Sequence, residues 1–426
     1  MKISILITSK IQFHTAQFYI EQFQKKGVVI DLYTYKFIHK DVLQRDWKKI
    51  NVYFIEDLGV KFKIVKWIHF LLLLFFTPRE FSPMYYRWVF QRLKKNIIAF
   101  NFFKIGSIFF PNKHKNSVNK HIKKIIARIN LNLFKTKTIL NFTTNDQPHL
   151  LCQKDLNVIT IVESWDHPYK FPIGYVSDKV FVWNEALKMD WQAYQGDFKI
   201  EFGYQAKFDY LIGIHKNKDE IKKLNNFMYP FSTSSHSDTL LYNDEFRFVE
   251  QLASVLSIKG KTLFIKPKPS TPYGELDYFL KFPSIKILSY QKSIDGANYS
   301  LSESYNKNRI KEMDKVDIIL SRGTTFVFDA AIYGKPVVLF NFKTEYFPAL
   351  SKLNDFPHLS RHLFSKEENI ITIHNRSSLK SQIENLMDLD IIELGNSFSK
   401  YLNSWIQIDS SLSNITFCSN KIMKEL

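Results

Sequence analysis

The turn at residues 321–325 carries the side chains of this chain best suited to binding an anion. It reads Ser-Arg-Gly-Thr-Thr and separates an apolar run, residues 318–320, from a segment with helical character, residues 326–333. A glycine can take a positive φ, hydroxyls donate hydrogen bonds, and the backbone N–H groups that open a helix point at a bound phosphate. Arginine adds a guanidinium that pairs well with phosphate oxygens. The predicted phosphate-binding residues of this turn are Ser321, Arg322, Gly323, Thr324 and Thr325.

Polar side chains also follow two other predicted strands in the same half of the chain. The predicted strand that ends at Lys266 is followed by Lys268, and the one that ends at Phe231 is followed by Ser232 and Thr233. The carboxyl ends of parallel strands meet at one edge of a sheet, where ligands bind. We therefore expect the two lysines and the two hydroxyls to join the phosphate site.

Two carboxylates belong to this predicted donor site by their position. Asp329 lies on the helix after the turn, where it either faces the donor or forms a structural salt bridge. Glu345 follows the predicted strand at residues 337–340 and is predicted to bind ribose or sugar hydroxyls. No His/Asp cluster has the spacing of metal ligands. We therefore expect neither a metal ion nor a cofactor.

The first half of the chain contains candidates for a general base. His14 is predicted to lie in the turn after a strand at residues 2–8, and Glu163 and Asp166 follow a predicted strand at residues 158–162. Asp166 and His14 rank first, because a carboxylate or an imidazole can accept a proton from an acceptor hydroxyl. A structural role fits each of them equally well: a cap or joint hydrogen bond for Asp166, and a helix surface position for His14.

Short apolar runs alternate with helical segments, which predicts an α/β protein with parallel sheets. The chain has 426 residues, more than one hydrophobic core usually serves, so two domains are expected. The predicted division is an acceptor-side Rossmann-like domain at residues 1–205, a nucleotide-donor-binding domain at residues 206–395 and a helical tail at residues 396–426 that packs across the joint. The first domain carries a basic helical insertion at about residues 60–130.

Positive charge is concentrated in that insertion. The formal net charge is +18, and residues 81–145 contain thirteen Lys and Arg residues but no Asp or Glu. The apolar run Trp-Ile-His-Phe-Leu-Leu-Leu-Leu-Phe-Phe at residues 67–76 precedes it and is too short to span a bilayer. An apolar helix with a basic flank is typical of proteins that lie on an anionic membrane, although a buried core helix fits the run equally well. Two cysteines and no secretory signal predict a cytoplasmic protein, peripheral on the inner face of the cytoplasmic membrane.

Five stretches resemble a bacterial glycosyltransferase group of the GT-B class that builds capsule, lipopolysaccharide and teichoic-acid polymers and includes the CDP-glycerol glycerophosphotransferases. They cover most of residues 158–342, namely residues 162–174, 179–190, 200–209, 264–270 and 316–342. The family's Ser-Trp-Asp-Asn-Pro is matched at Ser164, Trp165, Asp166 and Pro168, with His167 in place of Asn. Its Pro-His-Pro is replaced by Pro267-Lys268-Pro269, which keeps a charge for donor phosphate but cannot transfer protons as histidine does.

The resemblance implies two Rossmann-like domains facing a cleft and transfer of a sugar from a nucleotide-sugar donor to a surface-glycan or lipid-linked acceptor. A CDP-glycerol-type polyol-phosphate transferase and a nucleotide-sugar epimerase of the same fold remain alternatives, because fold alone does not determine function. A nucleic-acid binder would explain the charge, but the sequence contains no recognised binding motif. Nucleic acid is therefore not an expected partner.

Overall fold

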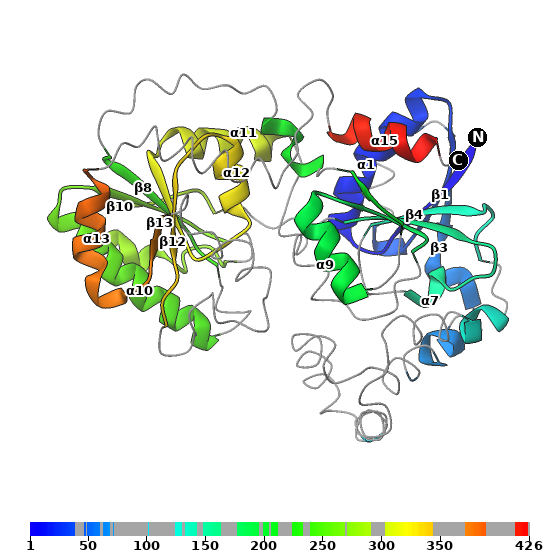
Figure 1. The fold of residues 1–426 in the computed structure, drawn as a ribbon, viewed down its shortest axis with the longest axis horizontal. Coiled ribbons are helices and arrows are strands. Elements are labelled where there is room, and N and C mark those ends of the chain that lie inside the picture. Colours follow the sequence, from blue (N-terminus) through cyan, green and yellow to red (C-terminus); the bar gives the residue numbers. More distant parts are fainter. Residues whose placement is uncertain are drawn as a thin grey trace. The chain divides into compact units, whose positions relative to one another are not determined.

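The computed structural model describes fifteen stretches of the chain and three single residues (Figure 1). The described residues are 1–38, 47, 49–59, 63–68, 71, 101, 124–129, 133–142, 148–162, 177–195, 199–203, 206–211, 224–232, 239–268, 271–290, 303–343, 371–388 and 414–424. The chain divides into two compact units. Unit 1 comprises Met1–Asp209 and Ile406–Leu426, and unit 2 comprises Tyr210–Trp405.

Unit 1 is built on a seven-stranded sheet with the order β3-β2-β1-β4-β5-β6-β7, in which neighbouring strands are parallel. The strand order reverses between β1 and β4, and such a switch point leaves a crevice at the carboxyl ends of the strands. Its strands are β1 (Lys2–Ile7), β2 (Val29–Thr34), β3 (Ile50–Phe54), β4 (Thr138–Phe142), β5 (Asn157–Ile161), β6 (Lys179–Val182) and β7 (Lys199–Phe202). Its helices are α1 (Lys10–Lys25), η1 (Ile55–Leu58), α7 (Pro148–Leu151), α9 (Glu185–Gln195), η2 (Ala206–Leu211) and α15 (Asn414–Met423).

Helix α1 begins at Lys10, four residues before His14. Ser9 caps it: the Ser9 hydroxyl accepts from the Gln12 backbone N–H, and the Gln12 side chain accepts from the Ser9 backbone N–H. This reciprocal capping box satisfies two groups that the helix start leaves unpaired. His14 therefore lies within α1, and its predicted place in the turn after β1 was wrong.

Helix α15, near the carboxyl end of the chain, packs on unit 1 beside α1, with Cys418 and Ile422 in the same apolar cluster as Phe23. Gly203, directly after β7, makes the close approach possible. A Cβ atom there would lie 2.7 Å from Cβ of Phe181, closer than real Cβ contacts allow, and 3.1 Å from Sγ of Cys418, which is a tight contact.

Unit 2 is built on a six-stranded parallel sheet with the order β10-β9-β8-β11-β12-β13. Counted within the unit this is again the order 3-2-1-4-5-6, and its switch point lies between β8 and β11. Its strands are β8 (Asn226–Pro230), β9 (Thr262–Lys266), β10 (Ile285–Ile287), β11 (Ile318–Ser321), β12 (Val337–Phe340) and β13 (Ile371–Ile373). Its helices are α10 (Thr239–Ile258), η4 (Asp277–Lys281), α11 (Glu303–Asp314), α12 (Phe326–Ile332), η9 (Arg376–Ser378) and α13 (Leu379–Leu386).

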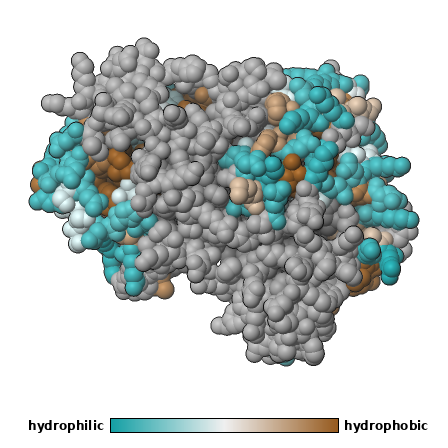
Figure 2. All heavy atoms as spheres, in the orientation of Figure 1, coloured by the Kyte–Doolittle hydropathy of each residue, from teal (hydrophilic) through white to brown (hydrophobic). Residues whose placement is uncertain are grey.

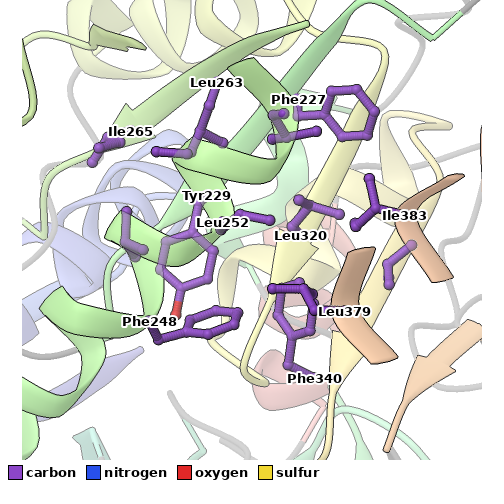
Figure 3. Packing of buried hydrophobic residues seen from close by; sticks show 14 of the residues in the cluster. Phe227, Tyr229, Phe248, Leu252, Leu263, Ile265, Leu320, Phe340, Leu379 and Ile383 are labelled. Carbon is purple, nitrogen blue, oxygen red and sulfur yellow. The ribbon is translucent and has the colours of Figure 1, made fainter. Parts of the chain in front are cut away.

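Aromatic side chains fill the core of unit 2 between the sheet and helices α10 and α13 (Figure 3). The ring of Phe248 on α10 lies 4.9 Å from that of Phe340 on β12 and 5.8 Å from that of Tyr229 on β8, centroid to centroid. Each such buried ring stabilises the fold by roughly 1.5–3 kcal/mol. Two parallel Rossmann-like sheets confirm the predicted α/β class.

Candidate functional site

The turn after β11 is held by its own first side chain. Ser321 is buried, and its Oγ accepts from the N–H groups of Gly323 (3.1 Å) and Thr324 (3.3 Å) and lies 3.3 Å from Oγ1 of Thr324. Gly323 has a φ of 81°, a value that side chains with a Cβ rarely adopt. Helix α12 begins at Phe326, and Thr324 and Thr325 are partly exposed in front of it. The turn therefore has a fixed shape with hydroxyls at its surface.

Glu245 of α10 joins this edge of the sheet at the end of β8. Its Oε1 accepts from the Tyr229 hydroxyl (2.8 Å), the Ser232 backbone N–H (2.9 Å) and the Ser232 hydroxyl (2.8 Å). Burial, with the Glu245 charge beside the phenol, raises the pKa of Tyr229 well above its usual value, and Arg322 acts in the opposite direction. Glu245, which the sequence did not single out, therefore fixes Ser232 at the switch point between β8 and β11.

Lys266, the last residue of β9, forms a buried ion pair with Glu312 of α11. Burial lowers the pKa of the Lys266 ammonium from its ordinary value, and the Glu312 carboxylate opposes that shift. Glu312 also accepts from the Ser289 hydroxyl at 3.2 Å. The ammonium that was predicted to bind phosphate is thus engaged inside the protein, whereas Lys268, two residues further on, is partly exposed.

Asp329 of α12 forms the second buried ion pair of this edge, at 2.5 Å from Arg309 of α11. Its other oxygen accepts from the Tyr210 hydroxyl at 2.8 Å. Of the two roles left open for Asp329, the structural salt bridge is the one present. Both ion pairs adjoin the ring of Phe326, whose centroid lies 4.9 Å from Cζ of Arg309 and 5.7 Å from Nζ of Lys266. Both ion pairs therefore pack against Phe326, the first residue of α12.

At the switch point of unit 1, the amide side chain of Gln12 links the ends of two strands. Oε1 of Gln12 accepts from the Thr8 N–H (2.5 Å) and the Thr8 hydroxyl (3.2 Å), and Nε2 of Gln12 donates to the Phe142 carbonyl (2.9 Å). The carboxyl ends of β1 and β4 are therefore linked through Gln12, two residues before His14 on the same helix.

Several predicted site residues lie outside the described part of the chain. They are Glu163, Asp166, Thr233 and Glu345. For the residues that are described, the sheet order places the end of β8, the end of β9 and the turn after β11 at one edge, as the sequence suggested.

No protein-family model matches the chain, and no curated protein sequence matches it. Among solved structures, MurG of Acinetobacter baumannii is similar over 100% of both chains, with 13% sequence identity and a TM-score of 0.50. The fold is GT-B-like. A putative UDP-N-acetylglucosamine 2-epimerase of Listeria monocytogenes has 9% identity and a TM-score of 0.48, over 99% of this chain and 94% of its own. The UDP-GlcNAc 2-epimerase of Neisseria meningitidis, bound to UDP-GlcNAc, has 12% identity and a TM-score of 0.48, over 100% and 99%.

In this GT-B-like fold, the edge of unit 2 offers hydroxyl and backbone donors in a fixed turn, supported by buried charges that do not themselves reach solvent. Such groups can bind a phosphate and stabilise the charge on a departing one. The described residues contain no group of three His, Cys, Asp or Glu side chains that could hold a metal ion.

Proposed function

We propose that the chain is a glycosyltransferase that moves a sugar from a nucleotide-activated donor to a surface-glycan or lipid-linked acceptor without a metal ion. The observation that carries the proposal is the carboxyl edge of the unit 2 sheet. There the turn at residues 321–325 follows β11 and Ser232 follows β8, the two strands that pair at the switch point of a Rossmann-like sheet, where nucleotides bind in folds of this kind.

The chemistry divides between two groups of residues. Thr324, Thr325 and Lys268 bind the donor's phosphates and stabilise the negative charge that builds up as the bond from the sugar C1 to the phosphate oxygen breaks. A base, Asp166 or His14, takes the proton from the acceptor hydroxyl as its oxygen bonds to C1. The nucleoside phosphate leaves with the bonding electrons, so no oxidant or reductant is needed.

The test is product analysis after incubation with a panel of nucleotide sugars, first selected by the rise in melting temperature that each one causes. A ligand that binds only the folded state at a hundredfold excess over Kd stabilises it by about 2.7 kcal/mol, which a melting curve resolves. Glycosyl transfer releases the nucleotide and, with an acceptor extract from a polysaccharide-producing bacterium, yields a lengthened glycan.

Two outcomes would contradict the assignment. Conversion of the nucleotide sugar to an isomer without release of nucleotide would make the chain an epimerase. Release of CMP from CDP-glycerol, with polyol phosphate added to the acceptor, would make it a polyol-phosphate transferase.

A further inference from the structure

Two short helical segments of unit 1, residues 63–68 and 124–129, are anchored in one apolar cluster. Val65 and Ile126 are buried in it together with Leu150 and Val158, and Ile68 packs against it. One inward-facing side chain from each segment thus fixes it on the unit. The residues one and two positions away on each side face other directions, because successive helix residues are turned by about 100°, whereas residues three or four positions apart share a face.

The outward positions of both segments carry large apolar side chains. Ile64 is 53% exposed and Trp67 58%, while Ile125 is 37% and Ile129 39% exposed. The four side chains belong to two segments that are anchored in the same apolar cluster. Exposed apolar side chains that are grouped in this way indicate an interaction surface, whereas a single exposed isoleucine does not. We call these four residues the apolar patch.

Basic side chains alternate with the apolar patch. Lys63 and Lys66 on the first segment and Lys124 and Arg128 on the second are all exposed. Neither segment contains an acidic residue, and the second lies in the stretch at residues 81–145 that has thirteen Lys and Arg residues and no Asp or Glu. Figure 2 shows brown and teal surface side by side at the lower right, where Figure 1 draws these segments. The partner of this surface must therefore accept aliphatic side chains and carry negative charge.

We propose that this surface binds the face of an anionic lipid bilayer. Tryptophan and isoleucine enter the boundary between head groups and acyl chains, while lysine and arginine remain at the charged head groups. Nucleic acid offers the same charge, but it takes up stacked aromatic rings and not the isoleucines that make up most of the patch. Among the described residues, no helix has both the length and the apolar character needed to cross a bilayer.

The test is co-sedimentation of the full chain with phosphatidylglycerol vesicles and with neutral phosphatidylcholine vesicles, at low and high salt. The wild type is expected to bind the anionic vesicles and to be released by salt, because exposed charges are screened beyond about 8 Å at physiological ionic strength. Each basic residue near such a surface contributes about fivefold to binding. A variant with Gln at positions 63, 66, 124 and 128 should therefore bind about six hundredfold more weakly.

Matched variants on unit 2 serve as controls. Lys311→Gln with Lys315→Gln removes exposed charge from the end of α11, and Ile258→Ser removes an isoleucine that is 71% exposed. Neither should change vesicle binding, whereas Ile64→Ser with Ile125→Ser should weaken it, and equal melting temperatures show that the variants fold. Equal partition to both vesicle types, binding to neither, or equal losses in the control variants would overturn the proposal. Retention by RNA in place of vesicles would also overturn it.

Discussion

The carboxyl edges of the two sheets are organised differently, although both sheets begin with the strand order 3-2-1-4-5-6, to which unit 1 adds a seventh strand at the edge. In unit 1, the described part of the edge at β1 and β4 is linked by the neutral side chain of Gln12. In unit 2 the corresponding edge holds two buried ion pairs, from α11 to Lys266 and to Asp329, and the Glu245 carboxylate beneath Ser232. The same topology therefore carries a charged support in one unit and an uncharged link in the other.

Buried charges of unit 1 lie elsewhere in its sheet. Lys179, the first residue of β6, pairs with Glu201 at 2.9 Å, and Lys2, the first residue of β1, pairs with Asp31 at 2.8 Å. These pairs lie toward the amino ends of their strands, where ligands of such sheets do not bind. The two sheets therefore differ in where their buried ion pairs lie, and the pairs at a carboxyl edge are those beside the proposed donor site.

The largest effects on turnover are expected from substitutions of the two candidate bases of unit 1. These substitutions would sharpen the comparison between the units, because they separate catalysis from donor binding. Asp166→Asn and His14→Ala should each lower turnover by about 10²–10⁴-fold while nucleotide affinity stays unchanged, because general base catalysis contributes about that much. Steady-state kinetics with calorimetry of nucleotide binding checks this. Wild-type turnover in both variants would exclude both residues, and loss in one alone assigns the role to that one.

The buried pair of Arg309 and Asp329 should contribute more to folding than an exposed pair of unit 1. Arg309→Met leaves the Asp329 carboxylate buried without its countercharge, which costs about 3–5 kcal/mol of unfolding free energy. The control, Lys36→Met, breaks an exposed pair with Asp57 and should cost under about 1 kcal/mol. Urea unfolding measures the loss of unfolding free energy in both variants. Equal losses in the two variants would break the contrast between buried and exposed pairs.

Gln12→Leu tests the link in unit 1. It leaves the Thr8 N–H and the Phe142 carbonyl without their side-chain partner in the interior, at a cost of about 1–3 kcal/mol of unfolding free energy. Nucleotide affinity should stay at the wild-type value, because the donor site is assigned to unit 2. A folded Gln12→Leu protein that had lost nucleotide binding would move the donor site toward unit 1.

The smallest effect is a pH dependence at Tyr229. Its pKa is raised in the folded state, so the stability that it contributes is fully present below the ordinary tyrosine pKa of about 10 and is lost as pH rises above it. The stability advantage of the wild type over Tyr229→Phe should therefore shrink by about 1 kcal/mol between pH 10 and pH 11, because half of the unfolded tyrosine is already ionised at pH 10. A constant difference from pH 8 to pH 11 would show that the tyrosine is not held in its neutral form.

Much of the fold could be predicted because buried parallel strands are short apolar runs. The strand at residues 337–340 was predicted with the bounds that the structure gives it, and the strand predicted to end at Lys266 does end there. Strand β7 was missed, because its four residues alternate charge with partly exposed apolar side chains at the edge of the sheet. Edge strands are not buried on both faces and lack the continuous apolar run.

Less of the candidate site could be predicted. The turn at residues 321–325 could be found because its shape depends on neighbours in sequence, from Ser321 to Thr324. The partners of Lys266 and Asp329 come from α11, whose composition is polar and suggests a solvent-exposed helix. The sequence does contain a sign that one face of this helix is buried. The buried residues recur at helical spacing, at Arg309, Glu312, Met313 and Val316. The pairing itself depends on how β9, α11 and α12 pack, which spacing alone does not give.

The most direct test of the account is calorimetry of nucleotide binding to a Thr324→Val/Thr325→Val double variant. The control is Thr262→Val, the same substitution at the opposite edge of the same sheet, where β9 begins. Removing two hydroxyls that donate to phosphate should weaken binding by roughly 1.5–3 kcal/mol per charged hydrogen bond, at least tenfold in Kd, with no change in the control. Wild-type affinity in a folded double variant would contradict the assignment of the donor phosphates to this turn.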